Sequence, residues 1–380
     1  MMNQSKKKKK IVWQQYIGMA FMMLIGVACG VVMVSYLDNA TADRPLYQEL
    51  LSLAGLFLGM YLAFFFHMIL HEAGHLVFGL LTGYRFSSFR VASFMWLKEN
   101  EKLKFKRLSL VGTGGQCLMT PPDLRDGKMP LVLYNLGGSL VNLLLGALFL
   151  VGYLLCSEMP FLSSLLFIFA IVGFMTALMN GIPMRMGTID NDGYNALALS
   201  KNQEAVEAFW VQLKVVEQSS KGIRIKDMPA EWFLVPTDEA MKNSMVAARG
   251  VFACNRLMDE EKFEEADALM AHLLAIESGI VGLHRNLLVC DRIYVELIGE
   301  NRREVIQTML TKEQKKFMKA MKRFPSVLRT QYALALLFES DTARAETVKR
   351  EFEQAAKTYP YAHEIGAERA FMKIAECKNQ

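Results

Sequence analysis

The sequence predicts a mainly α-helical protein. We expect a polytopic membrane domain of about four transmembrane helices with a small β-hairpin, followed by a cytosolic α-helical, repeat-like domain. Three observations support this: long uncharged runs lie in the first half of the chain, charged residues gather in the second half, and lysine and arginine are spread unevenly between the apolar runs. Of the 380 residues, 52% are hydrophobic and 21% are charged, so the average combines two unlike regions.

Four apolar segments are long enough to cross a bilayer, which takes about 20 apolar residues in a helix. A run of five lysines, Lys6 to Lys10, precedes the first segment. That segment exceeds the apolar core of a signal peptide, which has about 7–15 residues, so we interpret it as a retained anchor. The expected spans are residues 11–37, 50–82, 131–156 and 159–184.

The distribution of lysine and arginine predicts how these spans are oriented. Residues 83–130 hold nine Lys and Arg, whereas Arg44 alone lies between the first two spans. We therefore expect the basic N-terminus (1–10), the 83–130 segment and the C-terminal half (196–380) in the cytoplasm. This describes a multi-pass protein of the cell membrane, embedded in the lipid bilayer, with both termini cytoplasmic.

Charge and cysteine usage exclude other classes of function. The formal net charge of +5 is modest, and no basic patch with interleaved aromatic residues occurs, so we expect no nucleic-acid partner. The six cysteines contain no Cys-x-x-Cys pair, which argues against a cysteine zinc site and against a redox pair.

A His-Glu-x-x-His pattern lies at the end of the second apolar segment. His71 and His75 are four residues apart and so share one helix face, with Glu72 beside them. Two such imidazoles can hold Zn²⁺, and the carboxylate can act as general base on zinc-activated water. A glutamate at the centre of a membrane helix costs about 2.5–3.5 kcal/mol, which favours a functional role. The simpler alternative is a helix end whose polar residues only meet the membrane interface.

A catalytic zinc site needs three protein ligands and one open position. The segment after the fourth apolar run is the best source of the third ligand, because the second and fourth spans both end on the cytoplasmic side. This segment, residues 180–194, contains Asn180, Pro183, Asp190 and Asp192.

These residues resemble the site-2 protease family of intramembrane zinc metalloproteases. That family pairs His-Glu-x-x-His with a later Asn-x-x-Pro and an Asp-Gly. Here Asn180 and Pro183 match the first element, and Asp192 and Gly193 match the second. The resemblance implies that residues 11–195 form an intramembrane metalloprotease domain.

The resemblance also implies roles for individual side chains. Glu72 would be the catalytic base, and Asn180 would lie beside the site and bind substrate or the oxyanion. The implied ligands of Zn²⁺ are His71, His75 and Asp192.

Three further residues have alternative interpretations. Asp190 competes with Asp192 as third ligand, and the aspartate that does not bind zinc would cap a helix. We interpret His67 as a packed or hydrogen-bonded histidine, since a fourth ligand would fill the open position. Asn142, in a glycine-containing stretch of the third span, either bonds near the site or only packs between helices.

The segment between the second and third spans predicts the β-hairpin. Residues 86–97 are rich in Phe, Val and Trp, residues 98–101 form a charged turn, and residues 102–108 alternate charged and apolar side chains. We expect this hairpin to accept the substrate as an added strand; the simpler alternative is a surface hairpin with aromatic anchors. Glycine and proline pairs at 114–115 and 121–122 predict an irregular loop before the third span.

Residues 196–380 have a helical and polar pattern. The run from Phe263 to Leu274 resembles the second half of a tetratricopeptide-type hairpin. We therefore expect a solenoid whose concave face binds a protein partner, or else a plain helical bundle without one. We also expect that deleting residues from about 230 onward alters substrate choice and leaves zinc bound.

Together these features predict a zinc-dependent metalloendopeptidase. It would hydrolyse peptide bonds of membrane-embedded or membrane-associated protein or peptide substrates. The alternative from another class is a non-catalytic membrane scaffold or peptide-binding chaperone with a vestigial zinc site. The intact set of ligands and base favours the protease.

Overall fold

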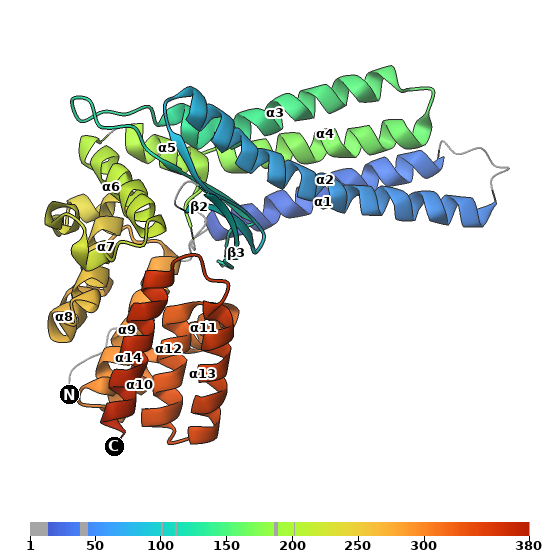
Figure 1. Cartoon of the computed structure of the whole chain (residues 1–380). Helices are drawn as coiled ribbons and strands as arrows, with labels where there is room; N and C mark the ends of the chain where they lie inside the picture. Colours follow the sequence, from blue (N-terminus) through green and yellow to red (C-terminus); the bar gives the residue numbers. More distant parts are fainter. Residues whose placement is uncertain are drawn as a thin grey trace, which may run out of the picture. The chain divides into compact units, whose positions relative to one another are not determined.

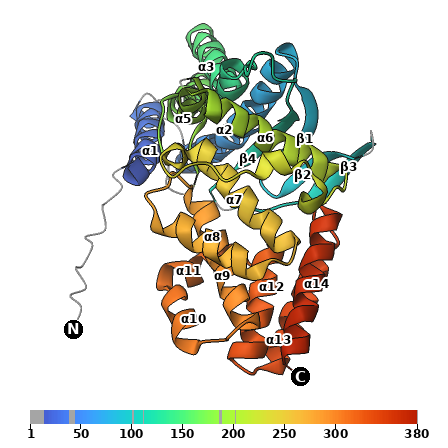
Figure 2. The same cartoon turned by 90° about the vertical axis from the view of Figure 1, so that its left-hand side faces the viewer.

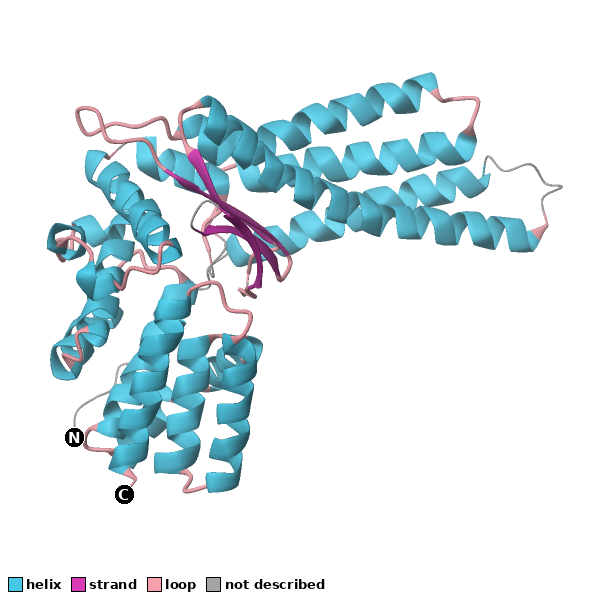
Figure 3. Cartoon of the chain, viewed as in Figure 1, coloured by secondary structure: helices cyan, strands magenta, loops and turns pink. Residues whose placement is uncertain are grey.

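The structure is a computed structural model that describes residues 14–38, 45–99, 102–110, 112–185, 189–200 and 202–379 (Figure 1). The basic N-terminus, 1–10, lies outside the described residues. The chain divides into two compact units. One comprises residues up to His67 together with Ser139–Tyr194, and the other comprises Met68–Gly138 together with residues from Asn195 onward. Helices dominate, and there is one small sheet (Figure 3).

Among the described residues, four helices are long and apolar enough to cross a membrane, which is the number expected from the sequence. Their mean hydropathy is between 2.0 and 2.4. They are α1 (Gln14–Asp38), α2 (Leu46–Leu81), α3 (Val132–Leu155) and α4 (Pro160–Gly181).

The first unit contains most of these apolar helices, except the end of α2 after His67 and the start of α3 before Ser139. Its core includes Ile25 of α1, Leu56 and Ala63 of α2, and Ile168 and Val172 of α4, all fully or almost fully buried. Many large apolar side chains on the same helices point outward instead. An apolar exterior of this kind is what a helix in lipid requires, since the bilayer itself solvates it.

The second unit contains a four-stranded antiparallel sheet in the order β3-β2-β1-β4. Its strands are β1 (Arg85–Val91), β2 (Phe94–Glu99), β3 (Lys102–Arg107) and β4 (Gly115–Thr120). The expected single hairpin was therefore too small: its first run breaks into β1 and β2, with Ala92 at φ 51° in the turn. The expected irregular loop was also wrong in part, because residues 115–120 form an edge strand beside β1.

One face of this sheet is covered by the C-terminal helices. Met95 and Leu97 of β2 are fully buried in the same core as Val251 and Leu288. The Arg107 amide donates a backbone hydrogen bond to the Thr358 carbonyl at 2.9 Å. The sheet and these helices therefore share one hydrophobic core.

The rest of the second unit is helical (Figure 2). Helix α9 packs against α8 and also against α12 and α14, which lie much further along the chain. In a solenoid each repeat contacts only its neighbours, so this pattern is closer to a bundle, and a repeat array is not confirmed. The helices are α5 (Asp192–Ser200), α6 (Gln203–Ser220), α7 (Ser244–Asp259), α8 (Phe263–Ala275), α9 (Gly282–Ile298), α10 (Arg303–Met309), α11 (Lys312–Ala320), α12 (Pro325–Ala333), α13 (Thr342–Ala356) and α14 (Ala362–Lys378), with short 3₁₀ turns at Ile225–Asp227, Ala230–Phe233 and Ala240–Lys242 and a π-helical turn at Leu334–Phe338.

Candidate metal centre

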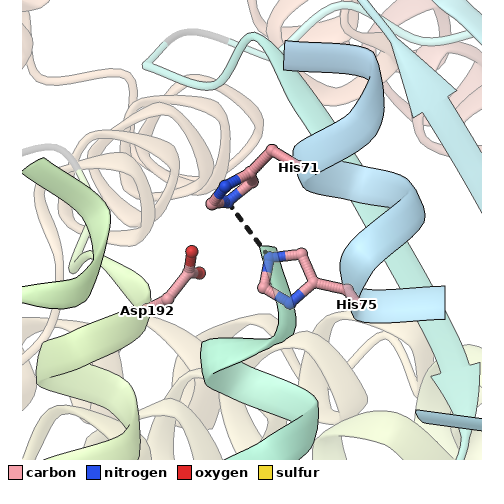
Figure 4. A group of neighbouring side chains, drawn as sticks. All are labelled: His71, His75 and Asp192. Carbon is pink, nitrogen blue, oxygen red and sulfur yellow. Dashed lines mark hydrogen bonds between the residues drawn. The ribbon is translucent and has the colours of Figure 1, made fainter. Parts of the chain in front are cut away.

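Three potential metal ligands lie together. His71 and His75, one turn apart on α2, meet Asp192, the first residue of α5 (Figure 4). One potential ligand atom from each residue lies within 4.8 Å of the other two. Within the described parts of the chain, this is the one group of three or more His, Cys, Asp and Glu side chains with that geometry. Two imidazoles and one carboxylate form a donor set that suits zinc and leaves a fourth position open.

The two imidazoles each bring an Nε2 atom to the same point. His75 Nδ1 lies 2.7 Å from the Tyr134 carbonyl oxygen, which can only accept, so this nitrogen carries the proton. The neutral ring then presents Nε2 as its acceptor, and this atom lies 3.2 Å from Nε2 of His71. Metal-binding histidines are typically oriented by such a bond from the other ring nitrogen.

Glu72 lies beside the ligands and against the edge strand β4. It is buried, at 8% exposure. A Cβ on Gly115 would lie only 2.4 Å from Glu72 Oε1, so the strand can approach the carboxylate this closely only with glycine at that position. The carboxylate is therefore confined between helix α2 and strand β4.

Arg90 is a contributor that the sequence analysis missed. This β1 residue is almost fully buried and donates to the carbonyls of Ala92 at 2.6 Å and Gly115 at 3.1 Å. Burial lowers the pKa of its guanidinium, and the charge of Glu72 opposes that shift. Arg90 thus fixes the carbonyl of the glycine that touches Glu72. An arginine within an otherwise buried strand was the available clue.

Asn191, also missed, holds the turn that leads to Asp192. Its Oδ1 accepts from the Met184 and Tyr194 amides, both at 2.9 Å. Its Nδ2 donates to the carbonyls of Met179 at 2.8 Å and Ile182 at 2.6 Å. Asn191 therefore caps helix α5, the role that the sequence analysis gave to one of the two aspartates.

The structure separates the two candidate aspartates. Asp192 belongs to the group that could hold a metal ion, whereas Asp190 does not. Asp190 Oδ1 instead lies 3.3 Å from Arg185 Nε in an ion pair. Gly193 fits this turn because a Cβ there would lie 2.2 Å from the Gly181 carbonyl oxygen. The Asp-Gly pair therefore meets two requirements. Its carboxylate is a potential metal ligand, and its glycine fits close to the Gly181 carbonyl.

His67 is held away from metal binding by hydrogen bonds. Its Nδ1 lies 3.2 Å from Asn142 Oδ1, and its Nε2 lies 3.0 Å from the Phe169 carbonyl oxygen. Asn142 also donates to Thr176 Oγ1 at 3.2 Å. This agrees with the interpretation of His67 as a hydrogen-bonded histidine and gives Asn142 a role between helices.

Asn180 lies near the end of α4. Its Nδ2 donates to the Thr176 carbonyl of the preceding turn at 3.0 Å. The amide is therefore bonded within its own helix, and its role toward a substrate stays a prediction.

Comparison with known proteins agrees with this geometry. Residues 58–215 match the family model described as Peptidase M50B-like. The matched region contains all five residues implied as ligands or catalytic groups, which are His71, Glu72, His75, Asn180 and Asp192. No curated protein and no solved structure matches the chain. The resemblance to the site-2 proteases is thus confirmed, and residues 58–215 form a Peptidase M50B-like region.

Proposed function

We propose that this protein is an intramembrane zinc metalloprotease that cuts membrane-embedded or membrane-associated proteins or peptides. The observation that carries the proposal is the grouping of His71 and His75 with Asp192, which lies more than 100 positions after them in the sequence. The Peptidase M50B-like match over residues 58–215 supports the same chemistry. Four apolar helices support its location in a membrane.

In this proposal each side chain has a distinct task. Zinc, when bound by His71, His75 and Asp192, would supply a Lewis acid that polarises the peptide carbonyl and brings the pKa of water near 7. Glu72 would take the proton from the attacking water and pass it to the leaving amine. The Tyr134 carbonyl would keep the His75 ring oriented through the exchange.

We further propose that the substrate enters beside β4. This is the strand that touches the base, through Gly115 and Glu72. An extended peptide would present its backbone there, as the chemistry requires. The Cys117 carbonyl of β4 already accepts a hydrogen bond from the Tyr134 hydroxyl at 2.8 Å. A substrate peptide added beside β4 would therefore pair with only part of the strand.

Replacement of the base tests the mechanism. Glu72→Gln keeps the shape of the side chain but cannot accept a proton, so zinc should stay bound while cleavage falls by at least about 100-fold. Zinc per chain is measured by mass spectrometry of the purified protein. Cleavage is followed by comparing membrane peptides from cells with the wild type and with the variant.

The matched comparison is His71→Ala, which should lose both zinc and cleavage. Substoichiometric zinc in the wild type would favour the non-catalytic scaffold instead. An unchanged peptide profile for Glu72→Gln would contradict the assigned role of the base.

A further inference from the structure

A cavity lies far along the chain from His71 and His75, in the C-terminal helices. This cavity, of about 330 Å³, opens among α7, α9, α12 and α14, and the segment from β3 to β4 closes one side of it. Its lining combines carboxyl groups and histidines with aromatic rings. Ligand pockets begin at about 300 Å³, so this volume suits one large side chain rather than a folded partner.

Carboxyl groups outnumber cations in this cavity. Asp291 of α9 and Glu364 and Glu368 of α14 face a single arginine, Arg329 of α12. Arg329 is 1% exposed, bonds to Asp291 and lies 3.3 Å from Glu368 Oε2 through its Nε. Arg329 therefore serves two of the three carboxyl groups, while Glu364 Oε2 accepts from the Tyr359 hydroxyl at 2.7 Å.

The fourth carboxyl group in the lining does not change this balance. Asp259 of α7 is paired with Arg224, whose Nε lies 3.1 Å from Asp259 Oδ1, and it also accepts from the Lys226 amide at 3.1 Å. That pair is neutral as a whole. The cavity therefore has an excess of potential negative charge on α9 and α14.

The histidines of the cavity do not supply the missing cation. Burial lowers the pKa of His284 to about 4 and also lowers that of His363, so both are neutral near pH 7. Both ring nitrogens of His363 and Nδ1 of His284 are buried and have no hydrogen-bond partner among the described residues. Three unsatisfied nitrogen atoms around one cavity are costly and are the feature that a ligand would remove.

The chemistry of the lining selects the class of ligand. An anion is disfavoured because Arg329 already serves Asp291 and Glu368. A metal ion is disfavoured because, in the part of the chain that the structure describes, the cavity has no group of ligand atoms as close as the one at His71. The Arg329 guanidinium already lies over the Phe371 ring, 5.6 Å from its centroid. The rings of Tyr359 and Tyr361 instead suit a cation carried on an aliphatic stem.

We propose that this cavity binds the cationic side chain of a lysine or arginine residue of a peptide. Glu364 and Glu368 would pair with the cation, and the aromatic rings would cover its stem. Gln116 of β4 also lines the cavity and is the neighbour of Gly115, which touches Glu72. The bound peptide would thus lie beside the strand next to the base, although the cavity would bind it whether or not the chain cleaves peptides.

The test uses the full chain in detergent micelles and two pairs of small probes. The first pair is acetyl-arginine amide and the neutral acetyl-citrulline amide, and the second is acetyl-lysine amide and acetyl-norleucine amide. Titration calorimetry should show each cationic probe binding at least about tenfold more tightly than its neutral partner. Equal binding within each pair, or no binding of any probe, would overturn the proposal.

Variants locate the effect. The double variant Glu364→Gln and Glu368→Gln should lose the preference for cationic probes, because it removes the charge of both side chains and keeps their shape. Glu353→Gln is the matched control: Glu353 lies on α13 and pairs with Arg369 at the surface, so the preference should persist. A preference that survives the double variant would place the binding elsewhere.

A further variant with glutamine at positions 6–10 separates two sources of the cation. If the chain's own lysine run occupies the cavity, the added probes should bind more tightly to this variant than to the wild type. If a separate peptide is the natural ligand, their affinity should not change. Either result agrees with a cation site, and the double variant decides whether the site is this cavity.

Discussion

The orientation of a single imidazole prepares the metal centre. Because the Tyr134 carbonyl holds the Nδ1 proton of His75, the lone pair of Nε2 is directed at His71. Nothing in the sequence around His75 identifies this carbonyl, since Tyr134 lies 59 positions later. The two histidines are thus local in sequence, while the group that orients one of them is not.

The choice between the two aspartates gives a prediction at the residue scale. Asp192→Asn should weaken zinc binding by more than about 100-fold, beyond the 10–100-fold typical of losing a supporting partner. Asp190→Asn should leave zinc affinity nearly unchanged, since Asp190 pairs with Arg185 instead. Zinc competition with a fluorescent chelator measures both. Equal losses in the two variants would contradict the assignment.

Gly115 gives a second prediction at this scale. Gly115→Ala places a methyl group about where Glu72 Oε1 now lies, 2.4 Å from the new Cβ. The base must move, and a displacement of about 1 Å can cost about 100-fold in rate. Cleavage should therefore fall while zinc content stays constant.

Gly366→Ala in α14 is the matched control, because an added Cβ there meets nothing within 4 Å. It should cleave at the wild-type rate. Normal cleavage by Gly115→Ala would show that Glu72 is free to shift, and the proposed role of β4 would fail.

At the scale of elements, predictability followed the strength of the local pattern. The apolar helices were predictable because about 20 uncharged residues in a row have few other stable structures. Strand β4 was not, because Gly114 and Gly115 indicate a loop. Its pairing is fixed by β1, whose Arg90 lies opposite Gln116. A strand defined mainly by its neighbour carries little pattern of its own.

Helix α14 gives a pH-dependent prediction. Burial raises the pKa of both Glu364 and Glu368 to about 7, with Arg329 partly opposing the shift of Glu368. A folded-state pKa above the unfolded value stabilises the fold below about pH 4.5, and this contribution is lost as the pH rises through 7. The free energy of unfolding of the wild-type protein should therefore fall by on the order of 2–3 kcal/mol per group between pH 5 and 8.

The double variant Glu364→Gln and Glu368→Gln should lack this loss, so its thermal midpoint should exceed that of the wild type at pH 8. Thermal melts of the full chain at pH 5.5 and 8 measure the difference. Glu353→Gln should follow the wild type, because its exposed pair with Arg369 lies outside the cavity. Parallel melting curves for all three proteins at both pH values would contradict the buried-carboxyl assignment.

At the scale of the whole molecule, the sheet and the C-terminal helices depend on one shared core. Met95 and Leu97 of β2 are buried against them. Deleting residues from about 230 onward would expose this face of the sheet, so a change in substrate choice could not be separated from damage to the sheet. Point variants in the cavity are the sharper test of a recognition role.

The proposed topology predicts which cysteines react from each side of the membrane. Cys377 is exposed near the C-terminus, and Cys156 is half-buried at the turn between α3 and α4. If both termini are cytoplasmic, a membrane-impermeant maleimide should label Cys156 in intact cells and Cys377 only after permeabilisation. Cys156→Ser and Cys377→Ser identify the two signals. The reverse pattern would invert the orientation.

The sequence by itself determined the membrane helices, the His-Glu-x-x-His pattern and the candidate third ligands, because these depend on hydrophobic length and on helical spacing within a few turns. Only the tertiary structure decided that Asp192 rather than Asp190 joins the histidines, that Asn191 caps α5, and that Arg90 supports Gly115. It also revealed the cavity around Glu364 and Glu368. The physical reason is that each of these depends on atoms brought together by folding from distant parts of the chain, which no local pattern encodes.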